Sequence, residues 1–375
     1  MLLTETIKLK LNKEQKKLVI TAMKTYISAV NDLVKLGASG VSITKFSSKD
    51  VHVGLPSAVR TQIAQDARSI LKKHYKKCHQ VVIKNRKRRF DEKKKAPKLP
   101  VVKKPCCYWN NQNFKLVTEN DVTYLNFPVM INGKSTRISV RMIITDRQRE
   151  LLENRHLGTM RIVFKSNKLV AQITYEKEEP MFIGNKTMGV DLGIKVPAVS
   201  YTSDGHIKFY GNGRKNKYIR RHFAYLRKKL QNKKRIKEVK RISNKEQRIM
   251  KDIDHKISRA IVDEAIKRNV DTIKLEQLSN IRSTTRKSRE NNHSLHTWSF
   301  YRLASYIEYK AALVGIKVAY VNPAYTSQKC PVCGNLNHAE DRNYGCQCGH
   351  KSHRDIVGAK NICMSTEIVG KRLSA

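Results

Sequence analysis

Acidic residues are scarce in this chain. Among its 375 residues, 31 are Asp or Glu and 76 are Lys or Arg, so the formal net charge is +45. An excess of this size destabilises a compact chain by self-repulsion unless a polyanion neutralises it. Phosphate backbones neutralise such charge with release of counterions. The composition therefore favours a nucleic acid as the partner.

Long apolar runs are also missing. No stretch of the sequence is long and apolar enough for a bilayer-spanning helix, and residues 1–6 lack the features of a signal peptide. Hydrophobic residues still make up 40% of the chain, which at this length can supply cores for two or more domains. We therefore expect a soluble intracellular protein with no membrane partner.

Cysteine is too sparse and too uneven for a disulfide framework, because four of the eight cysteines lie between positions 330 and 348. They form two close pairs twelve residues apart, Cys330 with Cys333 and Cys346 with Cys348. Four thiolates in two pairs suit a tetrahedral Zn²⁺ ion, whose role would be structural because no coordination position stays open. We favour ligation by all four cysteines. The alternative ligands are His338, His350 and His353.

Three of the acidic residues have distinctive local sequences. Asp191 ends an apolar β-type run and is flanked by two glycines, which let a ligand approach the backbone closely. Glu276 ends the β-type run 272–275, and we expect a similar setting for Asp355 within residues 353–362. Hard divalent cations such as Mg²⁺ take oxygen ligands, and a metal pair can stabilise both oxygens of a phosphodiester displacement. Each acid taken singly is typical of a solvated strand end, but together we interpret them as one metal-dependent nuclease centre.

The basic run 214–241 holds fourteen Lys or Arg and the single acid Glu238. Interleaved apolar residues predict a helix that packs one stripe and exposes the rest. Exposed helices more often carry mixed charge, so we interpret this run as a nucleic-acid contact rather than a plain solvated face. The residues predicted to bind nucleic acid, including one from a later loop, are Arg214, Lys215, Arg220, Arg221, Arg227, Lys228, Lys229, Lys234, Arg235 and Arg282.

The first half of the chain carries an opening strand, helices and then further strands. Residues 4–11 alternate polar and apolar side chains, Asn12 is a helix cap, and a second helix begins near Ser57. The basic segment 84–104 is interrupted by prolines, and we interpret it as a mobile linker that can also contact phosphate. Five β-type runs follow it, at 114–117, 122–127, 135–140, 160–164 and 168–175. With the opening strand they suggest a small antiparallel barrel that carries the helical block as an insertion.

The second half begins with a β-rich stretch. The strand that ends at Asp191 is followed by strands 196–201 and 206–210, so the acid lies on the first of three strands. A core helix is predicted over residues 254–266. Residues 279–296 are polar and predict a mobile loop beside Glu276. An amphipathic helix after position 298 and a strand at 315–321 complete the pattern.

The second half resembles the RuvC-type, RNase H-like nuclease core of the TnpB family, which comprises transposon-encoded RNA-guided nucleases related to type V CRISPR effectors. The matching stretches are residues 189–194, 275–278 with 281–282, 325–334, and 353–355 leading to 361–362. One spacing departs from the family, because Cys346 stands one position later than the family pattern places it. The first half resembles the family only in its general layout.

The resemblance implies an α+β and α/β multidomain fold: an RNase H-like (RuvC) nuclease core with a zinc-finger insertion, preceded by a small β-barrel (wedge) with an inserted helical recognition block. It also implies a lid over the active site at 279–296. The implied boundaries are 1–11 for the first wedge strand, 12–95 for the recognition block, 96–180 for the wedge barrel, 181–324 for the core with a basic helical insertion at 211–250, 325–350 for the zinc finger and 351–375 for the last RuvC segment.

The function that the resemblance implies is RNA-guided cleavage of DNA. Asp191, Glu276 and Asp355 would bind two Mg²⁺ ions of an endodeoxyribonuclease, and the cysteines one structural Zn²⁺. The partners would be a guide RNA copied from the transposon end and a target DNA cut next to a short motif that the protein reads. We expect a monomer in the cytoplasm of a prokaryote, associated with the nucleoid when it is on DNA.

Three other functions stand as alternatives. A nuclease-silent RNA-guided DNA-binding repressor would usually lack one acid of the triad, and all three are present here. A transposase or a transposition accessory protein is the second alternative, but the sequence has no obvious tyrosine-recombinase or serine-recombinase signature. An unguided structure-specific resolvase would share the core without needing the zinc insertion or the basic first half.

Overall fold

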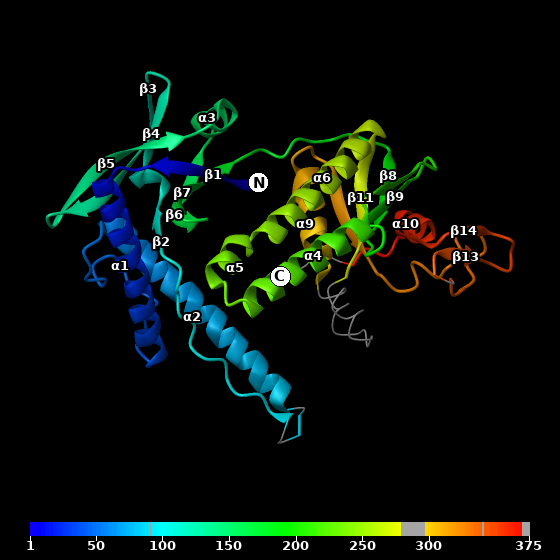
Figure 1. The fold of residues 1–375 in the computed structure, drawn as a ribbon, viewed down its shortest axis with the longest axis horizontal. Helices are drawn as coiled ribbons and strands as arrows, with labels where there is room; N and C mark the ends of the chain where they lie inside the picture. Colours follow the sequence, from blue (N-terminus) through cyan, green and yellow to red (C-terminus); the bar gives the residue numbers. More distant parts are fainter. Residues whose placement is uncertain (87, 90–91, 279–296, 340, 370–375) are drawn as a thin grey trace. The chain divides into compact units, whose positions relative to one another are not determined.

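The chain folds into two compact units, Met1–Glu178 and Glu179–Ala375. A computed structural model describes residues 1–86, 88–89, 92–278, 297–339 and 341–369, and Figure 1 labels the helices and strands. Each unit has a hydrophobic core of its own. No helix within these ranges combines the length and the apolar character that a membrane crossing requires.

The first unit is built on a seven-stranded antiparallel sheet with the order β2-β6-β7-β1-β5-β4-β3. Its strands are β1 (Leu2–Lys10), β2 (Cys106–Trp109), β3 (Lys115–Glu119), β4 (Val122–Ile131), β5 (Lys134–Ile143), β6 (Leu157–Lys165) and β7 (Lys168–Glu176). Its helices are α1 (Lys13–Ala38), α2 (Ser57–Arg86), the 3₁₀-helix η2 (Asn111–Asn113) and α3 (Asp146–Glu153). The opening strand β1 pairs with both β7 and β5, so α1 and α2 are an insertion after the first strand. The closed barrel stays a prediction, because the described strands pair in a linear order that ends at β2 and β3.

Local signals in the first unit act as the sequence predicts. The Asn12 side chain accepts a hydrogen bond from the Gln15 backbone N–H at 2.8 Å and the Gln15 side chain returns one, which is a capping box at the start of α1. Asn132 and Gly133 take positive φ angles of 50° and 75°, as a tight hairpin turn between β4 and β5 requires.

Strand β2 was not predicted. It has four residues that directly follow the basic, proline-rich segment, and so short a run shows no alternation. Its last residue, Trp109, is buried against Phe127 with ring centroids 4.9 Å apart, and its indole N–H donates to the Pro128 carbonyl oxygen at 3.0 Å. Contacts from β4, distant in sequence, therefore decide this strand.

The second unit contains a five-stranded sheet with the order β10-β9-β8-β11-β12 and a separate two-stranded hairpin. The strands are β8 (Lys186–Asp191), β9 (Ala198–Thr202), β10 (Ile207–Tyr210), β11 (Val270–Glu276), β12 (Lys317–Val321), β13 (Asn343–Gly345) and β14 (Lys351–His353). The helices are α4 (Gly213–Asn232), α5 (Ile236–Ile242), α6 (Lys245–Lys267), α9 (Phe300–Ala312) and α10 (Arg354–Met364). Strands β8, β9 and β10 are antiparallel, whereas β11 and β12 run parallel to β8 and to each other.

Two helix predictions were wrong in their extents. The basic run 214–241 is not one helix, because Lys234 takes a positive φ of 54° between α4 and α5. The core helix predicted over 254–266 begins earlier, at Lys245, as part of α6. Its first turns are rich in charge and bury only Met250, so their apolar periodicity was too weak to mark the start.

Strand β8 separates two packed layers. Met188 and Val190 point into the core formed with α6 and α9. Side chains alternate along a strand, so Gly189 and Asp191 face the opposite side, where α10 packs. A Cβ at Gly189 would overlap the Ala359 carbonyl oxygen and lie 2.8 Å from the Cα of Cys363. Only glycine lets α10 come this close.

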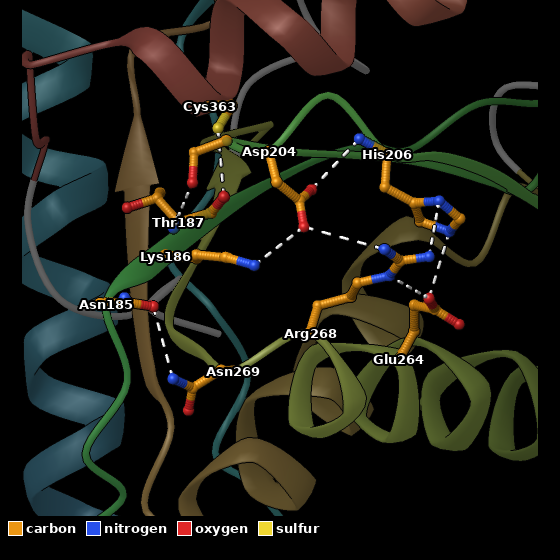
Figure 2. A network of polar contacts seen from close by, with 10 residues as sticks. Asn185, Lys186, Thr187, Asp204, His206, Glu264, Arg268, Asn269 and Cys363 are labelled. Carbon is orange, nitrogen blue, oxygen red and sulfur yellow. Dashed lines mark hydrogen bonds and ion pairs between the residues drawn. The ribbon is translucent and has the colours of Figure 1, made fainter.

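A network of ion pairs lies at the other end of β8 (Figure 2). Glu264 is buried and accepts from Lys208 Nζ at 2.6 Å and from Arg268 Nε at 3.2 Å, while Asp204 accepts from Lys186 Nζ at 3.1 Å. The hydrogen bond from Lys208 is the main reason why the pKa of Glu264 is below its usual value. Lys186 begins β8 and Asp191 ends it, so the network lies at the end of the strand opposite to the acids. It connects the sheet to the end of α6.

Gly189→Ala should destabilise the second unit by about 3 kcal/mol or more, because the new methyl group meets backbone atoms that cannot move independently. Chemical denaturation followed by circular dichroism measures the loss. Gly345→Ala is the matched control, since a Cβ there meets nothing within 4 Å. Equal stability of the two variants would contradict the close packing of α10 on β8.

Candidate functional site

Two of the predicted acids lie at the ends of neighbouring strands. Strands β8 and β11 are parallel neighbours whose register pairs Val190 with Leu275. The next residues are Asp191 and Glu276, which end their strands at the same edge of the sheet. Because Val190 and Leu275 both point into the core, the two acids share the opposite face, the one that α10 covers.

Helix α10 brings the third acid to this edge. Asp355 lies in its first turn, where the His353 ring caps the helix by accepting from the Asp355 backbone N–H at 3.2 Å. Gly358 lies one turn further along the same face of α10, and a Cβ there would lie 3.0 Å from Oδ2 of Asp191. The structure thus unites the predicted triad, but Asp355 starts a helix, so the expected strand-end setting was wrong for this residue.

Burial and mutual repulsion make the site electrostatically strained without a cation. The pKa of Asp191 is raised well above its usual value, first by burial and then by the charges of Glu276 and Asp355. Burial also raises the pKa of Glu276, an effect that a hydrogen bond from the Thr326 hydroxyl opposes. Oδ2 of Asp355 is buried and has no hydrogen-bond partner among the described residues. An unpaired carboxylate oxygen in a cluster of like charges suits a divalent cation. The cation would neutralise the repulsion between the acids and take that oxygen as a ligand.

Neighbouring side chains hold the acids in place. Asn361, on α10, donates from Nδ2 to the carbonyl oxygens of Thr326 and Lys329, each at 2.7 Å. These bonds anchor the loop from which Thr326 reaches Glu276. Arg342 contacts Oδ1 of Asp355 and is the one cation among the described residues that pairs directly with an acid of the triad. Thr326 lies in the matching stretch 325–334, but the sequence assigned no role to it or to Arg342, because only the fold brings each of them to an acid.

Asp191→Asn should stabilise the metal-free protein relative to wild type at neutral pH, because the amide removes a buried charge next to two others. The raised pKa means that the folded wild type binds a proton that the unfolded chain has lost, so wild-type stability falls as pH rises above the usual value of 3.8. The advantage of the variant should therefore grow with pH. Thermal unfolding in chelator measures it. Added Mg²⁺ should stabilise wild type alone; equal stabilisation of both proteins would contradict cation binding at Asp191.

The four cysteines come together beside the β13–β14 hairpin. Within the described ranges they are the one group of at least three His, Cys, Asp or Glu residues whose ligand atoms all lie within 4.8 Å of one another. The Sγ atoms of Cys330 and Cys348 are 3.7 Å apart, and those of Cys333 and Cys346 are 3.4 Å apart. Tetrahedral coordination with Zn–S bonds of about 2.3 Å separates sulfurs by about 3.8 Å. The cluster can therefore bind Zn²⁺.

The late position of Cys346 does not prevent it from joining the cluster. Burial opposes ionisation of Cys330, but backbone N–H groups of Cys333 and Val332 outweigh it and lower the thiol pKa to about 6. The pKa values of Cys333 and Cys348 are raised instead, so a bound cation is what would ionise all four thiols. The alternative ligand His353 is engaged in capping α10, and the cluster includes neither His338 nor His350.

The purified protein should carry about one Zn²⁺ per chain, measured by plasma mass spectrometry. Cys330→Ser and Cys346→Ser should each release it and weaken the fold around Asp355, because β14 leads directly into α10. His350→Ala is the matched control and should keep the metal. Loss of zinc in that control, with retention in Cys346→Ser, would contradict ligation by four cysteines.

The predicted nucleic-acid contacts divide between two faces of α4 and its surroundings. Arg220 is half-buried, and desolvation lowers its pKa, while Arg227 pairs with Glu246 of α6 at 2.8 Å. These two side chains connect α4 to its own unit. Arg235 lies near Glu238 at 3.5 Å beyond the end of α4. The exposed members of the set are Arg214, Lys215, Arg221, Lys228, Lys229, Lys234 and Arg235.

Part of the prediction lies outside the described residues. Arg282 and the expected lid at 279–296 belong to a range that the structure does not describe. Arg282 stays a prediction for that reason.

Comparison with known proteins identifies the family. Residues 171–282 match the family model described as "probable transposase", and residues 300–362 match the model of the Cas12f1-like TNB domain. A TnpB-like protein of Methanocaldococcus jannaschii is 31% identical over 252 residues, which cover 62% of this chain and 88% of that protein. The chain belongs to the TnpB family. The resemblance found in the motifs is thus confirmed.

More distant relatives of this TnpB-family chain are CRISPR-associated endodeoxyribonucleases. Cas12f1 of Sulfoacidibacillus thermotolerans is 31% identical over 220 residues, covering 53% of this chain and 51% of that protein. Cas12f1 of Syntrophomonas palmitatica is 26% identical, and the match covers 53% of it. The chain thus spans about half the length of these two relatives.

Solved structures share the fold. The structure of a Cas12f1–sgRNA–target DNA complex matches with a TM-score of 0.67 at 15% identity, covering 94% of this chain and 82% of that one. A mini-RNA-guided endonuclease, CRISPR-Cas_phi3, matches with a TM-score of 0.55 at 12% identity, covering 96% and 92%. The mixed α/β fold expected from the sequence is therefore that of Cas12 effectors.

Proposed function

We propose that this chain is an RNA-guided DNA endonuclease of the transposon-associated type. The observation that carries the proposal is the meeting of Asp191, Glu276 and Asp355, which are up to 164 positions apart in sequence, at one edge of one sheet. Family membership supports it, because relatives in the comparison carry the name endodeoxyribonuclease. The guide would come from the transposon end, and the protein would read a short motif beside the target.

The five-stranded sheet is proposed to be a RuvC-like, RNase H-like core. Three antiparallel strands followed by two parallel ones, with an acid ending the first and the fourth, agree with that assignment. The first unit would then be the wedge and recognition module, and residues 325–350 the zinc finger. The basic insertion proposed at 211–250 corresponds to α4, α5 and the start of α6.

The triad residues would hold the catalytic Mg²⁺ ions. When bound, the two Mg²⁺ ions together would supply an activated water and stabilise the leaving oxygen of the phosphodiester. The ligand atoms of the three acids do not all lie as close together as those of the four cysteines, so the acids could hold more than one ion. Thr326 orients Glu276 by its hydroxyl, and Asn361 keeps that loop in place. Arg342 neutralises part of the charge on Asp355 and fixes the orientation of its carboxylate through Oδ1.

A nuclease-silent repressor is the second candidate function. It would keep the guide and the target but lose the acids. All three acids are present. Asp355 is buried, Asp191 and Glu276 are partly buried, and the three charges repel one another. A protein that only bound DNA would gain nothing from three acids that repel one another, so cleavage is the better-supported function.

The deciding assay reprograms the guide. The protein is purified with its co-transcribed RNA, the target-matching end of the RNA is changed, and the scaffold is kept. Cleavage should move to DNA that matches the new sequence, because base pairing selects the target. Asp191→Ala should reduce cleavage to background while binding DNA nearly as wild type does, since the acid binds metal and not the duplex.

Two outcomes would contradict the proposal, one its dependence on a guide and the other its cleavage activity. Cleavage that ignores the guide and follows DNA shape or a fixed site would identify an unguided nuclease. Guided binding without cleavage by the wild-type chain, in Mg²⁺, would identify the repressor instead.

A further inference from the structure

Helix α4 presents an exposed aromatic row in the middle of its basic face. Tyr218 and Tyr225 are 68% and 61% exposed, and His222 between them is also exposed. The rings of Tyr218 and His222 stack with centroids 6.0 Å apart and an interplanar angle of 20°. Spacings of four and three residues place all three on one face of the helix. We call Tyr218, His222 and Tyr225 the aromatic row.

The packing of α4 does not depend on Tyr218 or Tyr225. Phe223 is 9% exposed and lies on the opposite face, as do Arg220 and the Arg227 that pairs with Glu246. That face attaches α4 to α6. His222 stacks on Tyr218 and also meets Phe223 edge-on, with ring centroids 5.6 Å apart. A single exposed tyrosine is common on protein surfaces, but two on one helix face with a ring stack between them form an exposed aromatic surface that suits a ligand or a partner.

Charge restricts what can cover the row. The charged residues of α4 are all cations, since the helix contains no acidic residue. The six exposed cations of α4 around the row are Arg214, Lys215, Lys217, Arg221, Lys228 and Lys229. Aromatic rings amid cations suit unpaired nucleotides, whose bases stack on the rings while their phosphates meet Lys and Arg. A duplex would offer its phosphates only, since its bases are already stacked.

The start of α4 lies beside the acids. The Gly213 backbone N–H donates to the Lys195 carbonyl oxygen at 3.0 Å, and a Cβ at Gly213 would overlap the Ile194 carbonyl oxygen. Ile194 and Lys195 belong to the loop that connects Asp191 to β9. A strand lying along the basic face of α4 therefore leads toward the triad.

We propose that the aromatic row is a stacking site for an unpaired segment of the DNA strand that reaches the acids. The inference rests on the proposed function, because that function makes DNA the strand to be cut. Tyr218 and Tyr225 are about 10 Å apart along the helix axis, from the 1.5 Å rise per residue. That distance spans about three steps of stacked bases at 3.4 Å each, so both rings can serve one short segment.

The test compares ring removal with charge removal. The protein with its guide RNA, in the Asp191→Ala background that spares the probe, binds a labelled single-stranded DNA that does not match the guide, over a range of salt. Tyr218→Leu with Tyr225→Leu should weaken binding at least tenfold at every salt concentration and leave the salt slope unchanged. Tyr218→Phe with Tyr225→Phe is the matched control and should bind as wild type, since the rings remain.

Arg214→Gln with Lys215→Gln should instead flatten the salt slope, because fewer counterions are released. Unchanged affinity in the leucine variant would overturn the proposal, as would an equal loss for duplex DNA or a loss confined to an RNA probe of the same sequence. Wild-type cleavage that follows a reprogrammed guide, combined with full DNA binding by the leucine variant, would reject the stacking site and keep the proposed function.

Discussion

The close approach of α10 to β8 is the contact on which the site depends. Gly189 has no side chain, so the backbone of α10 lies directly on the strand that ends at Asp191. The first turn of the helix then places Asp355 next to that acid, and Gly358 leaves room for the Asp191 carboxylate. A larger residue at either glycine would move the helix outward and separate the acids. One packing distance thus controls whether three carboxylates form a single site.

The same helix connects the metal cluster to the acids. Its first residue follows β14, whose hairpin with β13 encloses Cys346 and Cys348, and its Asn361 holds the loop that precedes Cys330. A zinc ion bound by the four thiolates would fix both ends of that segment. The cluster needs no chemistry of its own to affect cleavage, because the position of α10 sets the geometry of Asp355 and, through Thr326, that of Glu276.

The two faces of α4 separate the residues that attach the helix from those that stay exposed. Phe223 and the Arg227–Glu246 pair hold the helix on α6, whereas the aromatic row and its cations remain exposed. The basic run therefore cannot be judged by charge alone. Arg220 and Arg227 look like phosphate contacts in the sequence, but the fold uses them within the protein. Charge in the sequence predicts a partner class, and the helix face decides which residues are free to meet it.

The sequence by itself predicted a nucleic acid as the partner class and pointed to the three acids and the four cysteines that the fold brings together, because these depend on composition or on short motifs whose chemistry is local. The acid Asp191 between two glycines and the close pairs of cysteines can be interpreted without knowing the fold. The capping box at Asn12 and the turn at Asn132 and Gly133 were likewise readable, since they involve residues near one another in the chain. Only the tertiary structure decided the short strand β2, the helical setting of Asp355 and the roles of Thr326 and Arg342. These depend on contacts between residues that are distant in sequence, and no local pattern encodes which distant residue a side chain will meet.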